Sequence, residues 1–247
     1  MPYDSEAFLR ALSRFVRLLP TDYDMATALD ELVDAVMNVL ELAGAGVSLE
    51  SAGSLRFVTA PNPAIAAIEQ CQETTQQGPC VAAFRSGRPA PITDLAERVP
   101  QWPEYTAVAA RHGLRAAAGI PMRLGENSIG AVNLYDSKVR AWHRTELEAA
   151  CVLADMATGY LVNADKLTQL HQLSAQLQHA LDSRVVIEQA KGMIATRNDI
   201  PLDEAFQLIR RYARTNQLHL RAVAHAIVEG GLRISQEDTC PGAPDRP

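Results

Sequence analysis

The sequence AAAGIPMRLGENSIGAVNLYD occupies residues 116–136 and consists of two apolar runs separated by the turn residues GENS. Apolar runs on either side of a turn predict a β-hairpin. Three more strand-like runs occur earlier: AGVSLE at 45–50 and LRFVTA at 55–60, which SAGS joins, and a short run at 90–93. Together these five runs predict a largely antiparallel sheet.

Helical patterns surround these strands. Apolar residues three and four positions apart predict amphipathic helices at residues 5–19, 25–40, 64–71, 79–86 and 104–112. The first of them fills an N-terminal segment, residues 1–20, which Pro20 ends. Strands and helices in this order indicate an α+β domain, with a mostly antiparallel sheet flanked by helices.

The composition is that of an ordinary globular protein. Of its 247 residues, 47% are hydrophobic and 21% are charged, and the net charge is −6. This excludes a wholly disordered or collagen-like chain. No apolar run approaches the ~18 residues that a membrane span requires, and the N-terminus lacks the features of a secretory signal. We therefore expect a cytoplasmic protein without membrane contact.

The four cysteines are Cys71, Cys80, Cys151 and Cys240, and their spacing is irregular. It includes neither a CxxC pair nor any Cys/His spacing typical of zinc sites. We expect reduced thiols and no metal.

A long helix follows the last strand, over residues 145–181, where no proline occurs and Gly159 is the only glycine. Nine of its residues fall on the alternating three- and four-residue steps of a coiled-coil heptad, and seven of these are apolar or aromatic. A coiled-coil dimer and a single long helix packed on its own domain both fit this pattern. The residues expected at the dimer contact are Leu153, Tyr160, Leu167, Leu170, Leu177 and Leu181.

Three short helices are expected next, at 184–197, 202–216 and 220–230, followed by a disordered tail at 234–247. Residues 182–233 carry eight Lys and Arg against six Asp and Glu, whereas the chain as a whole is acidic. This segment is therefore the candidate nucleic-acid surface. Phe206 and Tyr212 belong to the apolar stripes of these helices, and we expect them in the core. The candidate RNA-contacting residues are the basic residues beside these stripes: Lys191, Arg210, Arg211, Arg214 and Arg221.

The stretch SRVVIEQAKGMIATRNDIPLDEAFQLIRRYARTNQLHLRAVAHAIVEG, at 183–230, resembles the ANTAR domain, an RNA-binding module of bacterial transcription antitermination regulators. The resemblance implies an RNA-binding three-helix bundle over residues 183–233. Gly192 in mid-helix predicts close packing by another backbone, because glycine there costs about 1 kcal/mol relative to alanine. Pro201 departs from the family pattern, and we expect a changed cap before an unbroken second helix.

Residues 21–164 resemble a GAF domain, of the kind that precedes ANTAR in actinobacterial regulators. The similarity rests on several short motifs: QQGPC (76–80), TDL (93–95), QWPEY (101–105), HGLRA (112–116), GIP (119–121) and IGAVNLY (129–135). The NKFDE-type pattern of cyclic-nucleotide GAF domains is not found, and no cysteine is placed for a bilin. The resemblance implies a sensor domain, and it leaves its ligand open.

Cys80, Trp102 and Tyr105 are the candidate sensing residues. Cys71 and Cys80 allow three interpretations: structural thiols, redox sensing, or the chemistry of GAF-type free methionine sulfoxide reductases. The reactive forms need a lowered thiol pKa. Trp102 and Tyr105 fit either the lining of a small-molecule pocket or a plain hydrophobic core.

Taken together, these features predict a non-enzymatic regulator. Its GAF domain senses a signal, the long helix transmits the signal or sets the geometry of a homodimer, and the ANTAR bundle binds hairpins in nascent leader RNA so that a terminator cannot form. Two alternatives remain: a small-molecule or redox sensor whose bundle binds a protein partner, and a DNA-binding regulator. The third helix begins with Leu220, Arg221 and Ala222, which is poor in the polar side chains that read DNA bases.

Overall fold

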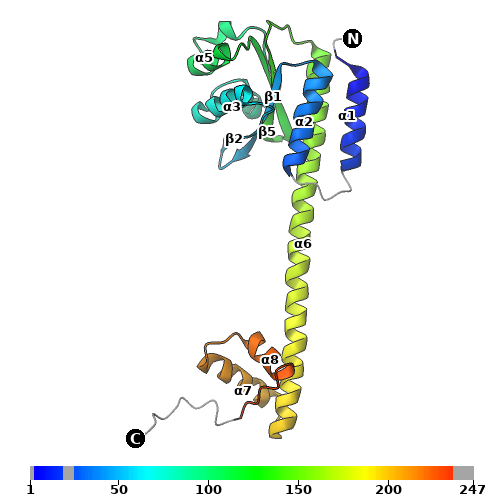
Figure 1. Cartoon of the computed structure of the whole chain (residues 1–247), viewed down its shortest axis with the longest axis vertical. Helices are drawn as coiled ribbons and strands as arrows, with labels where there is room; N and C mark the ends of the chain where they lie inside the picture. The colour runs from blue at the N-terminus through cyan, green and yellow to red at the C-terminus, as the bar shows by residue number, and fades with distance from the viewer. Residues whose placement is uncertain (1–2, 19–24, 236–247) are drawn as a thin grey trace. The chain divides into compact units, whose positions relative to one another are not determined.

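The computed structural model describes residues 3–18 and 25–235. It divides into two compact units, Met1–Leu167 and Thr168–Pro247, each of which is described by itself (Figure 1). The end of the expected N-terminal segment, at 19–20, and residues 236–247 of the expected tail lie outside the described residues. Within the described ranges, no helix combines the length and the apolar character needed to cross a bilayer.

The first unit is built on a five-stranded antiparallel sheet in the order β2-β1-β5-β4-β3. The strands are β1 (Gly44–Ser51), β2 (Ser54–Thr59), β3 (Ala90–Ile92), β4 (Ala116–Leu124) and β5 (Asn127–Asp136). All five expected strands are therefore present, and β4 and β5 form the expected hairpin. β5 pairs with β1 on its other side, which closes the centre of the sheet.

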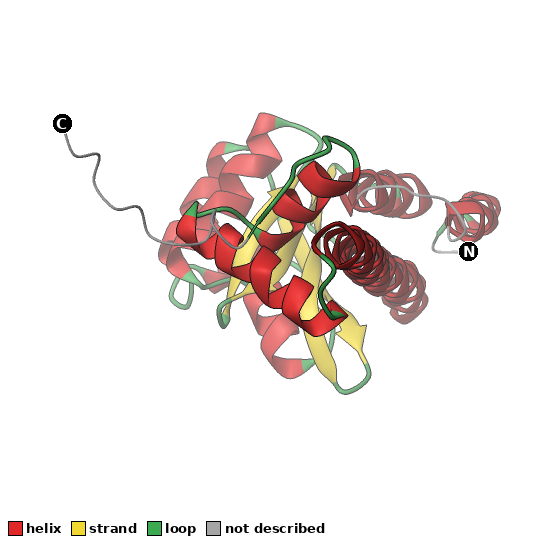
Figure 2. Ribbon diagram, turned by 90° about the horizontal axis from the view of Figure 1, so that it is seen from below, coloured by secondary structure: helices red, strands yellow, loops and turns green. Residues whose placement is uncertain are grey.

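Helices cover both faces of this sheet (Figure 2). α1 (Ser5–Leu18), α2 (Met25–Leu40) and the first part of α6 (Arg144–Asn198) share one apolar core with the strands. α3 (Pro63–Thr75), α5 (Pro103–Arg111) and the short 3-10 helix η1 (Leu95–Arg98) contribute to a second core. α4 (Pro79–Ser86) forms a smaller cluster with Leu55 and Ala131.

The alternation of side chains along β5 assigns its residues to the two faces. Val132 and Leu134 lie in the core that α2 and α6 cover. Tyr135 lies in the core that α3 and α5 cover, and the same alternation sends Asn133 to that face. A polar residue in the middle of an apolar strand thus points at α3.

α6 differs from the expectation, because it runs from Arg144 to Asn198 without the break expected near residue 183. No proline interrupts this stretch, and Ser183 Oγ donates to the carbonyl oxygen of His179 one turn earlier, at 2.7 Å. The first helix of the expected bundle is therefore the last part of α6.

The second unit packs this last part of α6 against α7 (Leu202–Thr215) and α8 (Leu220–Val228). Its core includes Ala190, Ile209 and Ile227, all fully buried. Ile234, which the sequence places in the tail, is also buried there, and Asn198 Nδ2 donates to its carbonyl oxygen at 3.2 Å.

Three details of this unit depart from the sequence expectations or refine them. A Cβ added to Gly192 would meet no atom within 4 Å, so the expected close backbone packing is wrong. Leu202 begins the apolar pattern of the second expected helix, but its side chain is exposed in the first turn of α7. Pro201 stands just before α7 with φ −60° and contributes no side-chain cap, and the helix after it is unbroken.

Candidate nucleic-acid interface and sensor site

Two cations lie over the ring of Phe206 on α7. Lys191 Nζ lies 5.4 Å from the centre of the Phe206 ring, and Arg210 Cζ lies 5.6 Å from it. Arg210 follows Phe206 by four residues, so the two share one helix face. Phe206 is half-buried and is not a member of the core of its unit, so its expected role as a core residue is wrong.

Glu188 fixes the position of the Lys191 ammonium. Lys191 Nζ donates to both carboxylate oxygens of Glu188, at 3.0 and 2.9 Å. The Lys191 side chain is only 15% exposed. Little of the Lys191 side chain is therefore accessible from outside.

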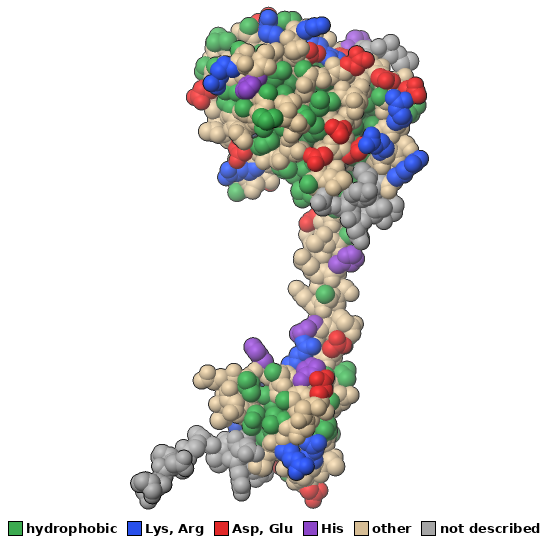
Figure 3. Space-filling view, in the orientation of Figure 1, with side chains coloured by type: hydrophobic (Ala, Val, Ile, Leu, Met, Phe, Trp, Pro, Cys, Tyr) green, Lys and Arg blue, Asp and Glu red, His purple; other side chains and the backbone are tan. Residues whose placement is uncertain are grey.

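Arg210 also borders a surface hollow of about 240 Å³ where α7 ends and α8 begins. The hollow is lined by Arg210, Ala213, Arg214, Leu218, His219 and Leu220. Arg210 and Arg214 thus share one site, and Arg210 connects it to Phe206. Basic side chains border apolar ones on the visible face of this unit (Figure 3).

The other two candidate RNA contacts lie outside the lining of the hollow. Arg211 is exposed, and Arg221 on α8 is half-buried. Neither is among the residues that line the hollow. Of the five candidates, the structure therefore brings Lys191, Arg210 and Arg214 together.

In the first unit, a fully buried carboxyl group stands between α3 and the sheet. Asn133 Nδ2 donates to both oxygens of Glu69, at 2.9 and 3.0 Å. Tyr135 Oη donates to Glu69 Oε1 at 2.9 Å, and Ser48 Oγ donates to Oε2 at 3.2 Å. Three strand residues thus converge on one side chain of α3.

Burial raises the pKa of Glu69 to about 7, although its hydrogen bonds with Asn133, Tyr135 and Ser48 act in the opposite direction. A carboxyl group with this pKa exchanges its proton near neutral pH. Burial and the neighbouring Glu69 also hold the pKa of Tyr135 well above its usual value, so this phenol stays protonated and donates.

The network continues to Cys80. Gln72, one turn after Glu69, donates through Nε2 to Tyr135 Oη at 3.1 Å, and its Oε1 accepts from the backbone N–H of Cys80 at 3.1 Å. Cys80 is fully buried, and burial together with Glu69 raises the pKa of its thiol well above the usual value.

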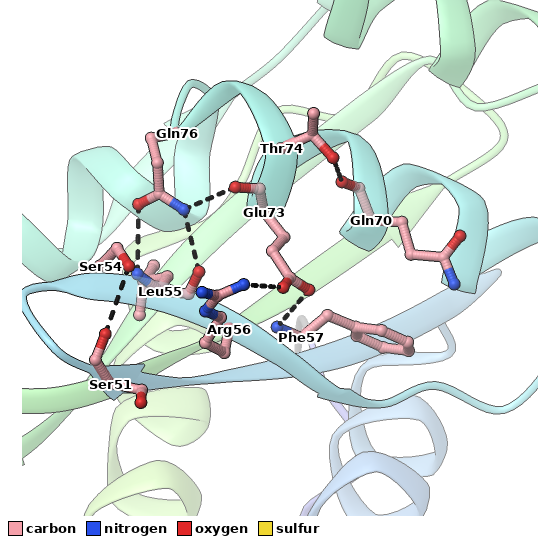
Figure 4. Close-up of polar contacts among 9 residues, drawn as sticks. All are labelled: Ser51, Ser54, Leu55, Arg56, Phe57, Gln70, Glu73, Thr74 and Gln76. Carbon is pink, nitrogen blue, oxygen red and sulfur yellow. Dashed lines mark hydrogen bonds and ion pairs between the residues drawn. The ribbon is translucent and has the colours of Figure 1, made fainter.

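The C-terminal part of α3 is fastened to the edge strand β2 (Figure 4). Glu73 accepts from Arg56 at 2.9 Å and from the backbone N–H of Phe57 at 3.1 Å. Gln76 Oε1 accepts from the N–H of Leu55 at 3.1 Å, and Nε2 donates to its carbonyl oxygen at 2.9 Å. These contacts hold α3 in the register that places Glu69 over the sheet.

The other sensor candidates are core residues. Trp102 and Tyr105 are buried in the core beside α3 and α5 and pack edge to face, with ring centres 6.1 Å apart. Cys71 is half-buried, and burial raises the pKa of its thiol. Cys71, Cys80 and Cys151 are free thiols. In the described part of the chain, no three His, Cys, Asp or Glu side chains are grouped to hold a metal ion.

The candidate dimerisation residues fall into two sets. Leu153 and Tyr160 are buried within the first unit, so they are not available to a second chain, which corrects that part of the expectation. The remaining four carry apolar side chains that are 37–59% exposed: Leu167, Leu170, Leu177 and Leu181.

Glu69 and its partners were missed from the sequence, although a signal for them exists. Ile65, Ile68, Glu69 and Gln72 follow the spacing of one buried helix stripe, and all four are buried. Two polar side chains on an apolar stripe indicate a buried polar cluster, because such groups need hydrogen-bond partners.

Two family models match the sequence. The model of the GAF domain matches residues 24–161, and the model of the ANTAR domain matches residues 175–228. Among proteins of curated function, none matches.

Solved structures share the fold of the first unit at low sequence identity. The free methionine-R-sulfoxide reductase of Neisseria meningitidis is 14% identical, with a TM-score of 0.51 over 66% of this chain and 95% of that one. A domain named for a two-component sensor histidine kinase of Sinorhizobium meliloti is 15% identical, with a TM-score of 0.52 over 61% and 99%.

Proposed function

Because this chain belongs to the GAF family and carries an ANTAR domain, an RNA-binding antitermination module, after its sensor domain, we propose that it binds hairpins in nascent leader RNA. A hairpin held by the protein prevents formation of the competing terminator, and transcription continues. The protein acts in the cytoplasm, where such transcripts are made, and it has no catalytic role of its own.

The observation that carries this proposal is the grouping of Lys191, Arg210 and Arg214 on one side of the second unit. Two of these cations lie over the Phe206 ring, and two line the same hollow. RNA phosphates are attracted to grouped cations, and unpaired bases stack on aromatic rings and guanidinium planes.

We further propose that the chain works as a homodimer through the exposed leucines of α6. Two copies place two small RNA-binding units on one transcript, which raises affinity through effective concentration. The GAF domain senses a small molecule or another signal. The buried hydrogen-bond network around Glu69 is the polar part of this domain that responds to the signal.

A binding titration tests the RNA proposal. The affinity of the full chain for a hairpin from its own leader transcripts is measured at several salt concentrations, for the wild type and for Arg210→Ala. Each phosphate contact contributes about 0.7 to the log–log salt slope on single strands. We expect Arg210→Ala to weaken binding and to lower the slope by about one contact.

Arg56→Ala is the control, because Arg56 is an exposed cation of the sensor unit that pairs with Glu73. Circular dichroism establishes that both variants are folded. Equal affinities of the two variants for the hairpin would overturn the assignment of this face, and tighter binding of matched duplex DNA would favour the DNA-binding alternative.

A further inference from the structure

We propose that the hollow between α7 and α8 holds one unpaired base of an RNA loop, stacked on the guanidinium plane of Arg210, with Phe206 supporting that plane from behind. This inference rests on the proposed function and specifies it further. Two contributions to RNA binding are then distinct. The cations attract the phosphates of any RNA, whereas the hollow binds only an unpaired base.

The backbone between α7 and α8 shapes the hollow. The chain leaves α7 through Asn216 and turns at Gln217, whose φ of 55° lies in the left-handed region. Leu218 then donates its N–H to the carbonyl oxygen of Ala213 at 2.8 Å. This turn sets the positions of Leu218 and His219, which line the hollow together with Arg210, so the site is formed before RNA arrives.

The size of the hollow limits its occupant. At about 240 Å³ it is smaller than the ~300–1,000 Å³ of sites for drug-sized ligands. Leu218 and Leu220 offer apolar surface for a base, whereas Arg214 and His219 offer polar groups at its edge. A single nucleobase combines an apolar face with a polar edge in this way, and its phosphate suits the cations that border the site.

The guanidinium of Arg210 is held in a position suited to stacking. Its guanidinium lies over the Phe206 ring at 5.6 Å, and the same ring carries the Lys191 ammonium, which Glu188 anchors. The side chain of Arg210 is half-buried. Arginine presents a flat surface on which a base can stack, whereas lysine offers a point charge without a plane.

The N-terminus of α8 borders the same hollow. His219 caps α8 with its backbone alone and places no side-chain acceptor on the N–H groups of the first turn. The N-terminus of a helix attracts negative charge. Because His219 and Leu220 line the hollow, this end of α8 suits the phosphate of the bound nucleotide.

The test compares two RNA probes with the full-length protein. One is the tightest-binding hairpin from a pool with a constant stem and a randomised loop. The other has the same stem closed by a non-nucleotide ethylene glycol linker, which removes the loop bases. The wild type should prefer the looped probe by about tenfold, within the range found for stacking of one base.

Arg210→Lys keeps the charge and removes the plane. We expect it to reduce the preference for the looped probe to within about twofold while the salt slope stays unchanged. Phe206→Leu, at the positioning residue, should reduce the preference in the same way, and Phe206→Tyr should restore it. Arg184→Lys is the matched control, because Arg184 is an exposed arginine of the same unit that does not line the hollow.

The outcomes separate the two proposals. If the wild type binds both probes equally, or if Arg210→Lys retains the full loop preference, the base site is refuted and RNA binding by the charged face still stands. If the wild type binds neither probe, both proposals fail.

Discussion

The side-chain amide of Asn133 donates to both oxygens of one buried carboxyl group. Its Nδ2 lies 2.9 and 3.0 Å from the two oxygens of Glu69. Asn133 comes from the central strand β5, and Glu69 comes from α3, 64 residues earlier. The contact joins the sheet to the helix layer within the buried polar cluster of the sensor unit. A change in the charge of Glu69 therefore acts on the packing of α3.

The first prediction concerns the pH dependence of stability. The pKa of Glu69 is about 7 in the folded protein and 4.5 as its unperturbed value. Between these two pH values, Glu69 holds a proton in the folded state that it has lost in the unfolded state. The contribution of Glu69 to the free energy of unfolding is therefore fully present below about pH 4.5 and is lost as pH rises to about 7. One pKa unit corresponds to about 1.4 kcal/mol, so the loss is on the order of 3 kcal/mol.

Denaturant unfolding across this pH range measures the effect, followed by tryptophan fluorescence, because both tryptophans, Trp102 and Trp142, belong to the sensor unit. Glu69→Gln should remove this part of the pH dependence. A parallel decline of the wild type and Glu69→Gln with rising pH would show that another group titrates.

The second prediction concerns the space beside Glu69. A Cβ on Gly46 would lie 2.7 Å from both Cδ and Cγ of Glu69. Because the carboxyl group is held by three partners, it cannot move without losing hydrogen bonds. Overpacking of this kind costs about 1–3 kcal/mol. Gly46→Ala should therefore lower the denaturation midpoint seen by tryptophan fluorescence, whereas Gly159→Ala should not, because a Cβ there meets nothing within 4 Å.

The strands of this fold could be predicted because each is a short apolar run with turn residues at its ends. The 45–50, 55–60 and 129–136 runs fall inside or beside β1, β2 and β5. The continuity of α6 through Ser183 was not predictable in the same way. A residue such as serine fits a helix interior or a boundary, and only its bond to His179 shows which of the two applies.

The candidate sites divide along a similar line. Arg210 and Arg214 could be found as basic residues four positions apart on one helix. The hollow beside them depends on the left-handed turn at Gln217, which sequence spacing does not indicate. Glu69 depends on the face that β5 turns toward α3, and this follows only from the register of the sheet.

The third prediction concerns Gly192. Glycine inside a helix costs about 1 kcal/mol relative to alanine, and a Cβ at this position has open space. Gly192→Ala should therefore stabilise the last part of α6 by up to about 1 kcal/mol. Hydrogen exchange of the surrounding amides in the full chain measures this as slower opening. Faster exchange would indicate that the glycine is needed for a contact of the bundle.

The fourth prediction concerns the dimer. Leu170 and Leu177 are 59% and 58% exposed on α6 and stand seven residues apart, at equivalent positions of the heptad. Burying such leucines against a second copy contributes about 1.5–3 kcal/mol each, and a glutamate in their place would bury a charge. Leu170→Glu combined with Leu177→Glu should therefore give a monomer by light scattering. Leu202→Glu is the matched control, because Leu202 is 54% exposed on α7 and lies off the heptad. If the double variant remains a dimer, the contact between copies lies outside these leucines. If it becomes a monomer, its affinity for a single hairpin should stay the same, and it should no longer bind paired hairpins more tightly than single ones. That result would show that the leucines link two RNA-binding units on one transcript.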